Sequence, residues 1–331
     1  GHAYEVATFR RDIEYTNGRT PNKIAWCAPR EDALRRDFTI NGMFYDPLER
    51  KIYDYVGGAE DIKRRIIRTI GDPYERFSED RLRMVRAFRF SLRFGFVIDP
   101  LTQEAIKANA ETLFPSVAIE RIWQEFQKMA KYEHLDTAFI EMMWLDLLPI
   151  IFPGLQGMHL NEVKSRVASF SKFPKKSPPL LYIAHLFHDA QLEEVHEIGK
   201  SLKISRDEAE LIDTLFAARH LIEKKEEDVV AWATYFTRRQ SLDVLESLAS
   251  SELFHSKKEF YEQYHEHIQR MRDKRPFITG KMLQDEGFKP GKEMGKWIKE
   301  AQKIALVHNL KDEQQVLEKI KMLPEWPKRK L

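Results

Sequence analysis

The chain has 331 residues, of which 43% are hydrophobic and 32% charged, a balance that allows several packed units and excludes a disordered chain. Its 54 lysines and arginines face 52 aspartates and glutamates, so any attraction to nucleic acid has to come from the local arrangement of charge. The single cysteine, Cys27, excludes an internal disulfide and a cysteine-based zinc site. Because the sequence has no apolar run of membrane-spanning length and no signal pattern in residues 1–20, we expect a cytoplasmic protein without membrane contact.

Short extended segments are predicted at the start of the chain. Residues 1–10 alternate between two faces, which is typical of a strand, and domains rarely begin inside a sheet, so we expect that a preceding segment is absent. Residues 43–45 and 51–55 flank a turn-forming stretch and predict a hairpin. A short strand is expected at 66–70, and from Ser78 onward the pattern predicts helices only.

Helix boundaries are marked by prolines and by capping residues. Ser78, Asp99 before Pro100, and Pro115 are start signals for three helices. Proline and lysine crowd residues 172–179, which predicts a loop or a domain seam there.

Asp80 and Arg83 have a spacing that suits recognition of a nucleotide base. Three residues apart on a predicted helix, they share one face and present a carboxylate acceptor beside a guanidinium donor. Cytosine and adenine offer an amino donor next to a ring-nitrogen acceptor, whereas uracil and guanine offer the reverse, so the pair favours C and A and leaves the other bases unpaired. The alternative is an ordinary ion pair on the surface of a helix.

The segment RRDFTIN at 35–41 combines groups that suit a nucleoside triphosphate. Arg36 offers paired donors to phosphate, and Asp37 and Asn41 can accept or bridge from sugar hydroxyls. The alternative is a basic turn that precedes an apolar segment.

Three blocks carry a resemblance to a known family: RRDFTINGMFYDP at 35–47, DYVGGAEDI at 54–62 and DPYERFSEDRLRMVRAFRF at 72–90. In this order and spacing they resemble the second nucleotidyltransferase motif, the linking segment and the base-recognition motif of class II CCA-adding enzymes and bacterial poly(A) polymerases. ERIWQEF at 120–126 resembles a further helical motif of that family, and 276–310 is similar to the tail of CCA-adding enzymes.

The resemblance implies an α+β fold, in which part of a nucleotidyltransferase palm with a small mixed sheet precedes a long series of helices. The expected domains are a partial head (palm) at 1–68, a helical neck with base recognition at 69–131, a helical body at 132–225 and a helical, RNA-binding tail at 226–331.

The resemblance also implies roles for individual residues. It assigns Asp80 and Arg83 to a protein-templated reading of the base, and we expect Glu79 and Arg86 to position these two side chains. In the tail, lysines are candidates for contacts with RNA phosphates, and the alternative for each is a solvated helix face. These lysines are Lys281, Lys289, Lys292 and Lys296.

Nucleotidyl transfer in this family implies Mg²⁺ as the cofactor, held by acidic side chains. Relatives carry a D-x-D pair on one strand and a third carboxylate on the neighbouring strand. EVATFR at 5–10 is similar to the strand with the third carboxylate, so Glu5 is the candidate catalytic and metal-binding residue, and the alternative is an exposed strand glutamate. The D-x-D pair has no match in the sequence, which is a second reason to expect that a preceding segment is absent. His185, His188 and Asp189 are expected to be ordinary helix residues and not metal ligands.

The leading hypothesis is a template-independent RNA nucleotidyltransferase that adds C and A to the 3′ end of tRNA from CTP and ATP and releases pyrophosphate. A rival hypothesis is a poly(A) polymerase that extends RNA 3′ ends with ATP, and enzymes that add only CC or only A are a further alternative. A hypothesis of another class is a catalytically silent RNA-binding remnant, because the D-x-D motif is absent.

Overall fold

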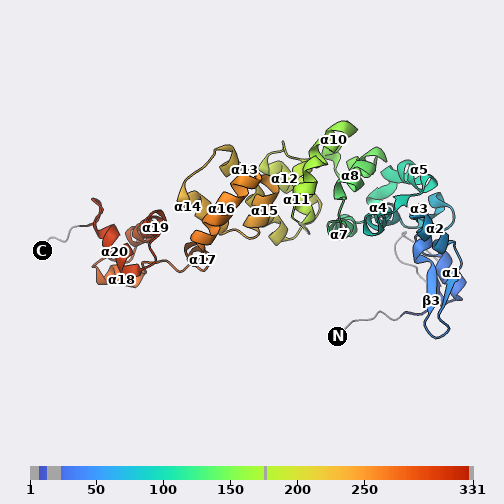
Figure 1. Ribbon diagram of the computed structural model, residues 1–331, viewed down its shortest axis with the longest axis horizontal. Coiled ribbons are helices and arrows are strands. Elements are labelled where there is room, and N and C mark those ends of the chain that lie inside the picture. The colour runs from blue at the N-terminus through green and yellow to red at the C-terminus, as the bar shows by residue number, and fades with distance from the viewer. Residues whose placement is uncertain (1–6, 13–23, 175–176, 328–331) are drawn as a thin grey trace. The chain divides into compact units, whose positions relative to one another are not determined.

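The computed structural model describes residues 7–12, 24–174 and 177–327 and divides the chain into two compact units, Gly1–Ser205 and Arg206–Leu331 (Figure 1). Strands occur in the first unit and helices in both, so the predicted α+β class is confirmed. Within the described ranges, no helix is both long enough and apolar enough to cross a membrane.

The strands of the first unit form three separate pairs among the described residues. β1 (Arg10–Asp12) pairs with β2 (Ile24–Trp26) and β3 (Met43–Asp46) pairs with β4 (Lys51–Asp54), both antiparallel, whereas β5 (Ile66–Ile67) pairs in parallel with β6 (Val97–Ile98).

The hairpin prediction is confirmed by β3 and β4. The prediction of helices alone after Ser78 is wrong at one place, because β6 pairs with β5. Its two residues are too few to show an alternating pattern. Most of the strand predicted over 1–10 lies outside the described residues.

The helices of the first unit follow one another with short connections. They are α1 (Pro29–Leu34), α2 (Gly58–Arg64), α3 (Pro73–Glu79), α4 (Leu82–Phe94), α5 (Pro100–Asn109), α6 (Leu113–Ser116), α7 (Ile119–Met129), α8 (Leu135–Trp144), α9 (Leu147–Ile151), α10 (Leu160–Val167), α11 (Pro179–Leu186) and α12 (Leu192–Ser201), with 3₁₀ turns η1 (Thr39–Asn41), η2 (Ala110–Thr112), η3 (Pro153–Leu155) and η4 (Ala168–Lys172). The predicted start at Asp99 is confirmed, since its side chain accepts a hydrogen bond from the N–H of Thr102 at the first turn of α5.

A short backbone ladder joins the strand-containing part of the first unit to its helices. Thr39 N–H donates to the carbonyl of Arg68 at 2.9 Å, and Ile70 N–H donates to the carbonyl of Asp37 at 3.2 Å. The next strand continues this ladder, because Asp99 N–H donates to Ile67 at 3.0 Å. The RRDFTIN segment is therefore fixed by main-chain hydrogen bonds beside the helices that follow it.

The loop that leads into α2 depends on Asp54. Its Oδ1 accepts hydrogen bonds from the N–H groups of Val56, Gly57 and Gly58 at 3.1, 2.9 and 3.0 Å, and its Oδ2 accepts one from Ala59 at 2.9 Å. Burial raises the pKa of Asp54, but these backbone hydrogen bonds outweigh burial and hold the pKa below its ordinary value. Asp54 thus caps α2 as an anion.

The second unit consists of helices in its described part. They are α13 (Arg206–Glu223), α14 (Val229–Phe236), α15 (Ser241–Leu248), α16 (Ser251–Gln263), α17 (His265–Arg272), α18 (Gly280–Asp285), α19 (Lys292–Val307) and α20 (Glu313–Lys321). The last three share a core of buried apolar side chains in which Leu283, Trp297 and Val316 meet. Breaks at Pro276 and 287–291 separate α17, α18 and α19.

Gly58 packs so closely on Thr39 that a side chain there would clash. A Cβ at Gly58 would lie 2.3 Å from the carbonyl oxygen of Thr39, whereas a Cβ at Gly295, near the start of α19, would meet nothing within 4 Å. We expect Gly58→Ala to lower stability by about 1–3 kcal/mol through overpacking, and Gly295→Ala to raise it by about 0.5–1 kcal/mol through helix propensity. Thermal and urea unfolding of both variants checks this, and a neutral Gly58→Ala would contradict it.

Candidate functional site

The candidate site is built on the segment that follows α1. Asp32, in α1, is 1% exposed, and its two oxygens hold two arginines. Oδ1 accepts hydrogen bonds from Nε and Nη2 of Arg35 at 2.9 and 2.7 Å, and Oδ2 lies 3.0 and 2.9 Å from Nε and Nη2 of Arg36. Spacings of three and four residues bring these side chains together.

Arg36 also reaches Asn41, which the sequence placed in the same site. Its Nη1 donates to the carbonyl oxygen of Asn41 at 2.8 Å, and its guanidinium lies 4.7 Å from the ring centre of Phe44. The Arg36 side chain is 36% exposed, so part of the guanidinium faces solvent.

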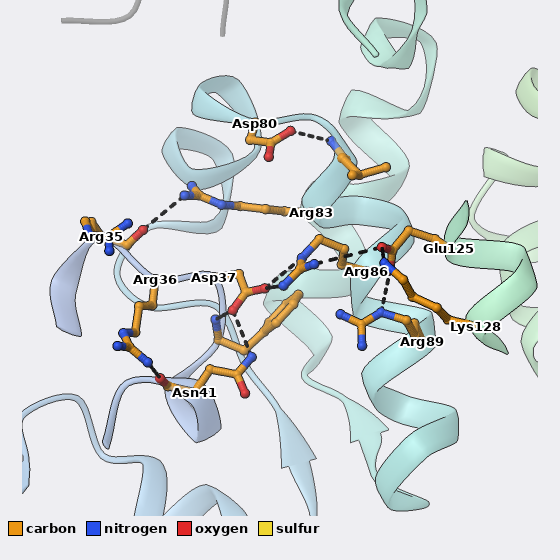
Figure 2. A network of polar contacts seen from close by, with 12 residues as sticks. Arg35, Arg36, Asp37, Asn41, Asp80, Arg83, Arg86, Arg89, Glu125 and Lys128 are labelled. Atoms are coloured by element: carbon orange, nitrogen blue, oxygen red, sulfur yellow. Dashed lines mark hydrogen bonds and ion pairs between the residues drawn. The ribbon is translucent and has the colours of Figure 1, made fainter. Parts of the chain in front are cut away.

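Asp37, which is buried, forms an ion pair with the partly exposed Arg86 of α4. Its Oδ2 accepts from Nε and Nη2 of Arg86 at 2.9 and 2.6 Å, and its Oδ1 accepts from Asn41 Nδ2 and from Phe38 N–H. Burial raises the pKa of Asp37, but the Arg86 charge and these hydrogen bonds outweigh it and leave the pKa below its ordinary value. Both oxygens are engaged within the protein, so the geometry gives Asp37 a holding role, and a ribose contact stays a prediction (Figure 2).

Asp80 and Arg83 do not lie on one helix, so that prediction is wrong. Asp80 has extended backbone angles, φ −146° and ψ 104°, at the break between α3 and α4. Ser78 belongs to the end of α3, where its hydroxyl donates to the carbonyl of Glu75 at 2.8 Å, and does not start a helix. Asp80 and Arg83 are still one turn apart, because Arg83 N–H donates to the Asp80 carbonyl at 3.1 Å.

The Arg83 side chain is anchored from three directions. Nη1 donates to Glu79 Oε2 at 2.6 Å and to the carbonyl of Arg76 at 3.0 Å, and Nη2 donates to the carbonyl of Arg35 at 3.1 Å. A guanidinium has five N–H groups, so these three bonds leave Nε–H and one N–H of Nη2 unused among the described residues. The predicted association of Glu79 with Arg83 is present in the geometry.

Asp80 is held more loosely than Arg83. Its Oδ1 accepts from Leu82 N–H at 3.1 Å, and its Oδ2 lies 3.4 Å from Nη2 of Arg121 in α7. The Asp80 side chain is 27% exposed and can present an acceptor to a ligand.

Glu125 of α7 connects α7 to α4. It is 2% exposed and contacts Arg89, Lys128 at 2.8 Å and Arg86 Nη1 at 3.9 Å. Arg86 was expected to position Asp80 and Arg83, but it instead joins Asp37 to Glu125, as Figure 2 shows.

The linking segment contributes structural carboxylates. Asp61 is 6% exposed and accepts from Thr39 Oγ1 at 2.7 Å and from Arg68 Nε at 3.2 Å. Arg68 also pairs with Asp99 at 2.6 Å. These contacts fix the linking segment to the backbone ladder.

The described residues include no group of three or more His, Cys, Asp and Glu side chains that could hold a metal ion. Glu5 lies outside the described residues. In the AHLFHD segment, Asp189 contacts Arg166 at 2.7 Å and His188 at 2.7 Å, and His185 Nδ1 lies 3.0 Å from the carbonyl of Leu181.

Lysines line one face of α19. Lys292 and Lys296, both predicted, are exposed, and so are Lys299 and Lys303, which sequence reasoning missed. At 100° per residue these four positions fall within an arc of about 60° and extend over about 16 Å of helix. Lys281 in α18 and Lys289 before α19 are exposed as well.

Sequence reasoning also missed three polar residues. The Asp32 contacts could have been found, because spacings of three and four residues are typical of helical ion pairs. Arg121 and Glu125 could not, because their partners are 41 and 36 residues away in the sequence.

Models of three protein families match the chain in succession. "Poly A polymerase head domain" matches residues 1–68, "Probable RNA and SrmB-binding site of polymerase A" matches 95–158, and tRNA nucleotidyltransferase domain 2 matches 181–320. The chain is 34% identical over 239 residues to the CCA-adding enzyme of Bacillus licheniformis and 29% identical over 319 residues to that of Pediococcus pentosaceus.

The chain belongs to the family of class II CCA-adding enzymes and bacterial poly(A) polymerases. The Bacillus licheniformis match covers 70% of this chain and 59% of the relative, and the Pediococcus pentosaceus match covers 95% and 78%. The chain thus spans less than two thirds of the length of the first relative.

Solved structures of the family share the fold. The Bacillus stearothermophilus CCA-adding enzyme in complex with CTP aligns with a TM-score of 0.73 at 22% identity, over 97% of this chain and 80% of that one. The Thermotoga maritima CCA-adding enzyme complexed with tRNA aligns with a TM-score of 0.63 at 19% identity, over 88% and 73%.

Asp37→Asn tests the ion pair of the candidate site. Removing the Asp37 charge leaves Arg86 with only the longer contact to Glu125 at 3.9 Å, so we expect a loss of about 1–3 kcal/mol at neutral pH. Because the folded-state pKa of Asp37 is lowered, its contribution is complete above about pH 4 and is lost as the pH falls through the folded-state value. In urea unfolding, the gap between wild type and variant should stay constant from about pH 7 to 5 and narrow below about pH 4.

The exposed Glu104 offers a control, since Glu104→Gln should produce no gap at any of these pH values. A gap for Asp37→Asn that persisted unchanged into strong acid would contradict the assignment.

Proposed function

We propose that the chain serves the template-independent addition of C and A to the 3′ end of tRNA, from CTP and ATP, with release of pyrophosphate. The observation that carries the proposal is that Arg83, in the first turn of α4, is hydrogen-bonded to the Arg35 carbonyl and follows Asp80 by one turn. An acceptor and a donor for a base thus adjoin cationic donors for phosphate.

Base selection follows from the hydrogen-bonding groups that remain available. Asp80 can accept from the exocyclic amino group of C or A, and an unused N–H of Arg83 can donate to the ring nitrogen beside it. U and G would set a carbonyl against the carboxylate and an N–H against the guanidinium, which leaves both polar pairs unsatisfied. The anchors on Arg83 hold its donor in place before the nucleotide arrives.

The remaining parts of the nucleotide have candidate partners nearby. Arg36 presents a partly exposed guanidinium that can donate to phosphate oxygens. We propose that Asn41 contacts the ribose, since Asp37 holds its side-chain amide and Arg36 holds its backbone carbonyl.

A divalent metal is general in the family, and we propose Mg²⁺ with Glu5 as one ligand. When bound, the metal would activate the attacking hydroxyl and neutralise the triphosphate. The described residues offer no complete set of metal ligands.

Poly(A) addition is the second candidate, because the family model over residues 1–68 is that of a poly(A) polymerase head and because the Asp80–Arg83 pair accepts A in either case. Addition of only CC or only A would use the same pair.

The proposal is tested by measuring incorporation of labelled CTP, ATP, UTP or GTP into a tRNA that lacks its CCA end, in the presence of Mg²⁺. We expect C and A to be added and U and G to be rejected, either by the chain itself or by the chain joined to an N-terminal segment that carries the D-x-D strand. Asp80→Ala and Arg83→Ala should each relax the rejection of UTP and GTP by about tenfold or more.

Glu60→Ala is the matched control, since Glu60 forms an ordinary exposed helix pair with Arg64 at 2.8 Å and should leave base choice unchanged. RNA binding without addition, by the chain alone and by the extended chain, would favour the silent RNA-binding module. Addition of A alone in long runs would favour the poly(A) polymerase. Unchanged selectivity in Asp80→Ala and Arg83→Ala would remove these two residues from base reading.

We further propose that the lysine face of α19 contacts RNA phosphates, together with Lys281 and Lys289. Each such contact releases counterions, so affinity should depend on salt. Lys299→Gln with Lys303→Gln should weaken tRNA binding and reduce the slope of log affinity against log salt by about 1–2.

Lys224→Gln with Lys225→Gln removes the same charge from exposed positions elsewhere in the second unit and is the matched control. Equal slopes for the two double variants would show that total charge, and not the α19 face, governs binding.

A further inference from the structure

Asp32 is more deeply buried than either of the two arginines that it pairs with among the described residues, and the function derived above does not use it. Its side chain is 2% exposed, against 28% for Arg35 and 36% for Arg36. A buried carboxylate is costly unless it is paired and hydrogen-bonded. Asp32 meets that requirement by dividing its two oxygens between the two arginines, one oxygen to each.

The printed contacts of this cluster join one acidic side chain to two basic ones. Both guanidiniums are partly exposed, whereas the carboxylate between them is buried. Arg36 uses Nε, Nη2 and Nη1 for Asp32 and the Asn41 carbonyl. Since each Nη carries a second hydrogen, Arg36 retains outward donors whose direction is set by the contacts on its other side.

The same carboxylate is linked to the residues proposed for the base and the ribose. Arg35, held through its side chain by Asp32, accepts Arg83 Nη2 at its carbonyl oxygen at 3.1 Å. Arg36, held by the other oxygen, donates to the Asn41 carbonyl at 2.8 Å. Asp32 therefore lies at the point where the contacts to the phosphate, ribose and base partners converge.

We propose that Asp32 is a positioning residue that orients Arg35 and Arg36 toward the polyphosphate of a nucleoside triphosphate. The inference rests on the proposed function for the identity of the ligand, but the anion-binding geometry can be tested separately. A positioning role and simple electrostatics predict opposite changes in anion affinity when Asp32 is neutralised. Loss of a negative charge beside an anion site should strengthen anion binding, whereas loss of orientation should weaken it.

The probe is inorganic tripolyphosphate, titrated by calorimetry into wild type, Asp32→Asn and Glu31→Gln. Glu31 is the matched control, because it lies next to Asp32 in the first turn of α1 and is exposed. We expect Asp32→Asn to weaken tripolyphosphate binding by about tenfold or more and Glu31→Gln to leave it equal or slightly stronger. Equal or tighter binding by Asp32→Asn would overturn the inference.

Asp32→Glu keeps the charge and both oxygens and should retain more affinity than Asp32→Asn. An equal loss in the two variants would contradict a positioning role, and thermal unfolding shows whether each variant is folded. Cytidine, which has no phosphate, should lose less affinity on Asp32→Asn than tripolyphosphate does.

CTP then separates the two proposals. Tripolyphosphate binding that depends on Asp32, without any preference for CTP over UTP, would support the positioning role and contradict the proposed base selection. Preference for CTP together with tripolyphosphate binding that is insensitive to Asp32→Asn would do the reverse.

Discussion

The ion pair between Asp37 and Arg86 is the contact on which the candidate site depends. It joins the RRDFTIN segment to α4 across 49 residues of sequence and is continued by Glu125 into α7. A partly buried pair of this kind is weak evidence for stability, because desolvation offsets attraction, but breaking it is costly. The pair therefore restricts these side chains to one geometry and adds little net free energy of folding. The backbone ladder at residues 37–39 and 68–70 holds the same geometry through the main chain.

Features set by local sequence were predictable. The hairpin of β3 and β4 and the Asp99 cap of α5 follow from turn and capping chemistry, and both are present. Ser78 misled the prediction because a hydroxyl can satisfy a helix carbonyl as readily as it can cap a start, and here it bonds Glu75 at the end of α3.

Features set by distant pairing were not predictable. The sequence placed Asp37, Asn41, Asp80, Arg83 and Arg86 in one functional region, but it could not say which of them face the ligand and which face each other. Asp37 and Arg86 bind each other, and Arg121 reaches Asp80 from 41 residues away. The packing of the RRDFTIN segment against α4, and of the α3–α4 break against α7, decides these partners, and no local periodicity of the sequence encodes it.

The contact between Asp80 and Arg121 bears on the affinity of the proposed base site. A base that takes the Asp80 carboxylate has to displace or share a partner 3.4 Å away. Under the proposed base reading, only C and A place an amino group on this carboxylate, so the cost falls on C and A and not on U and G. In that proposal Arg121 therefore narrows the margin by which the site prefers C and A.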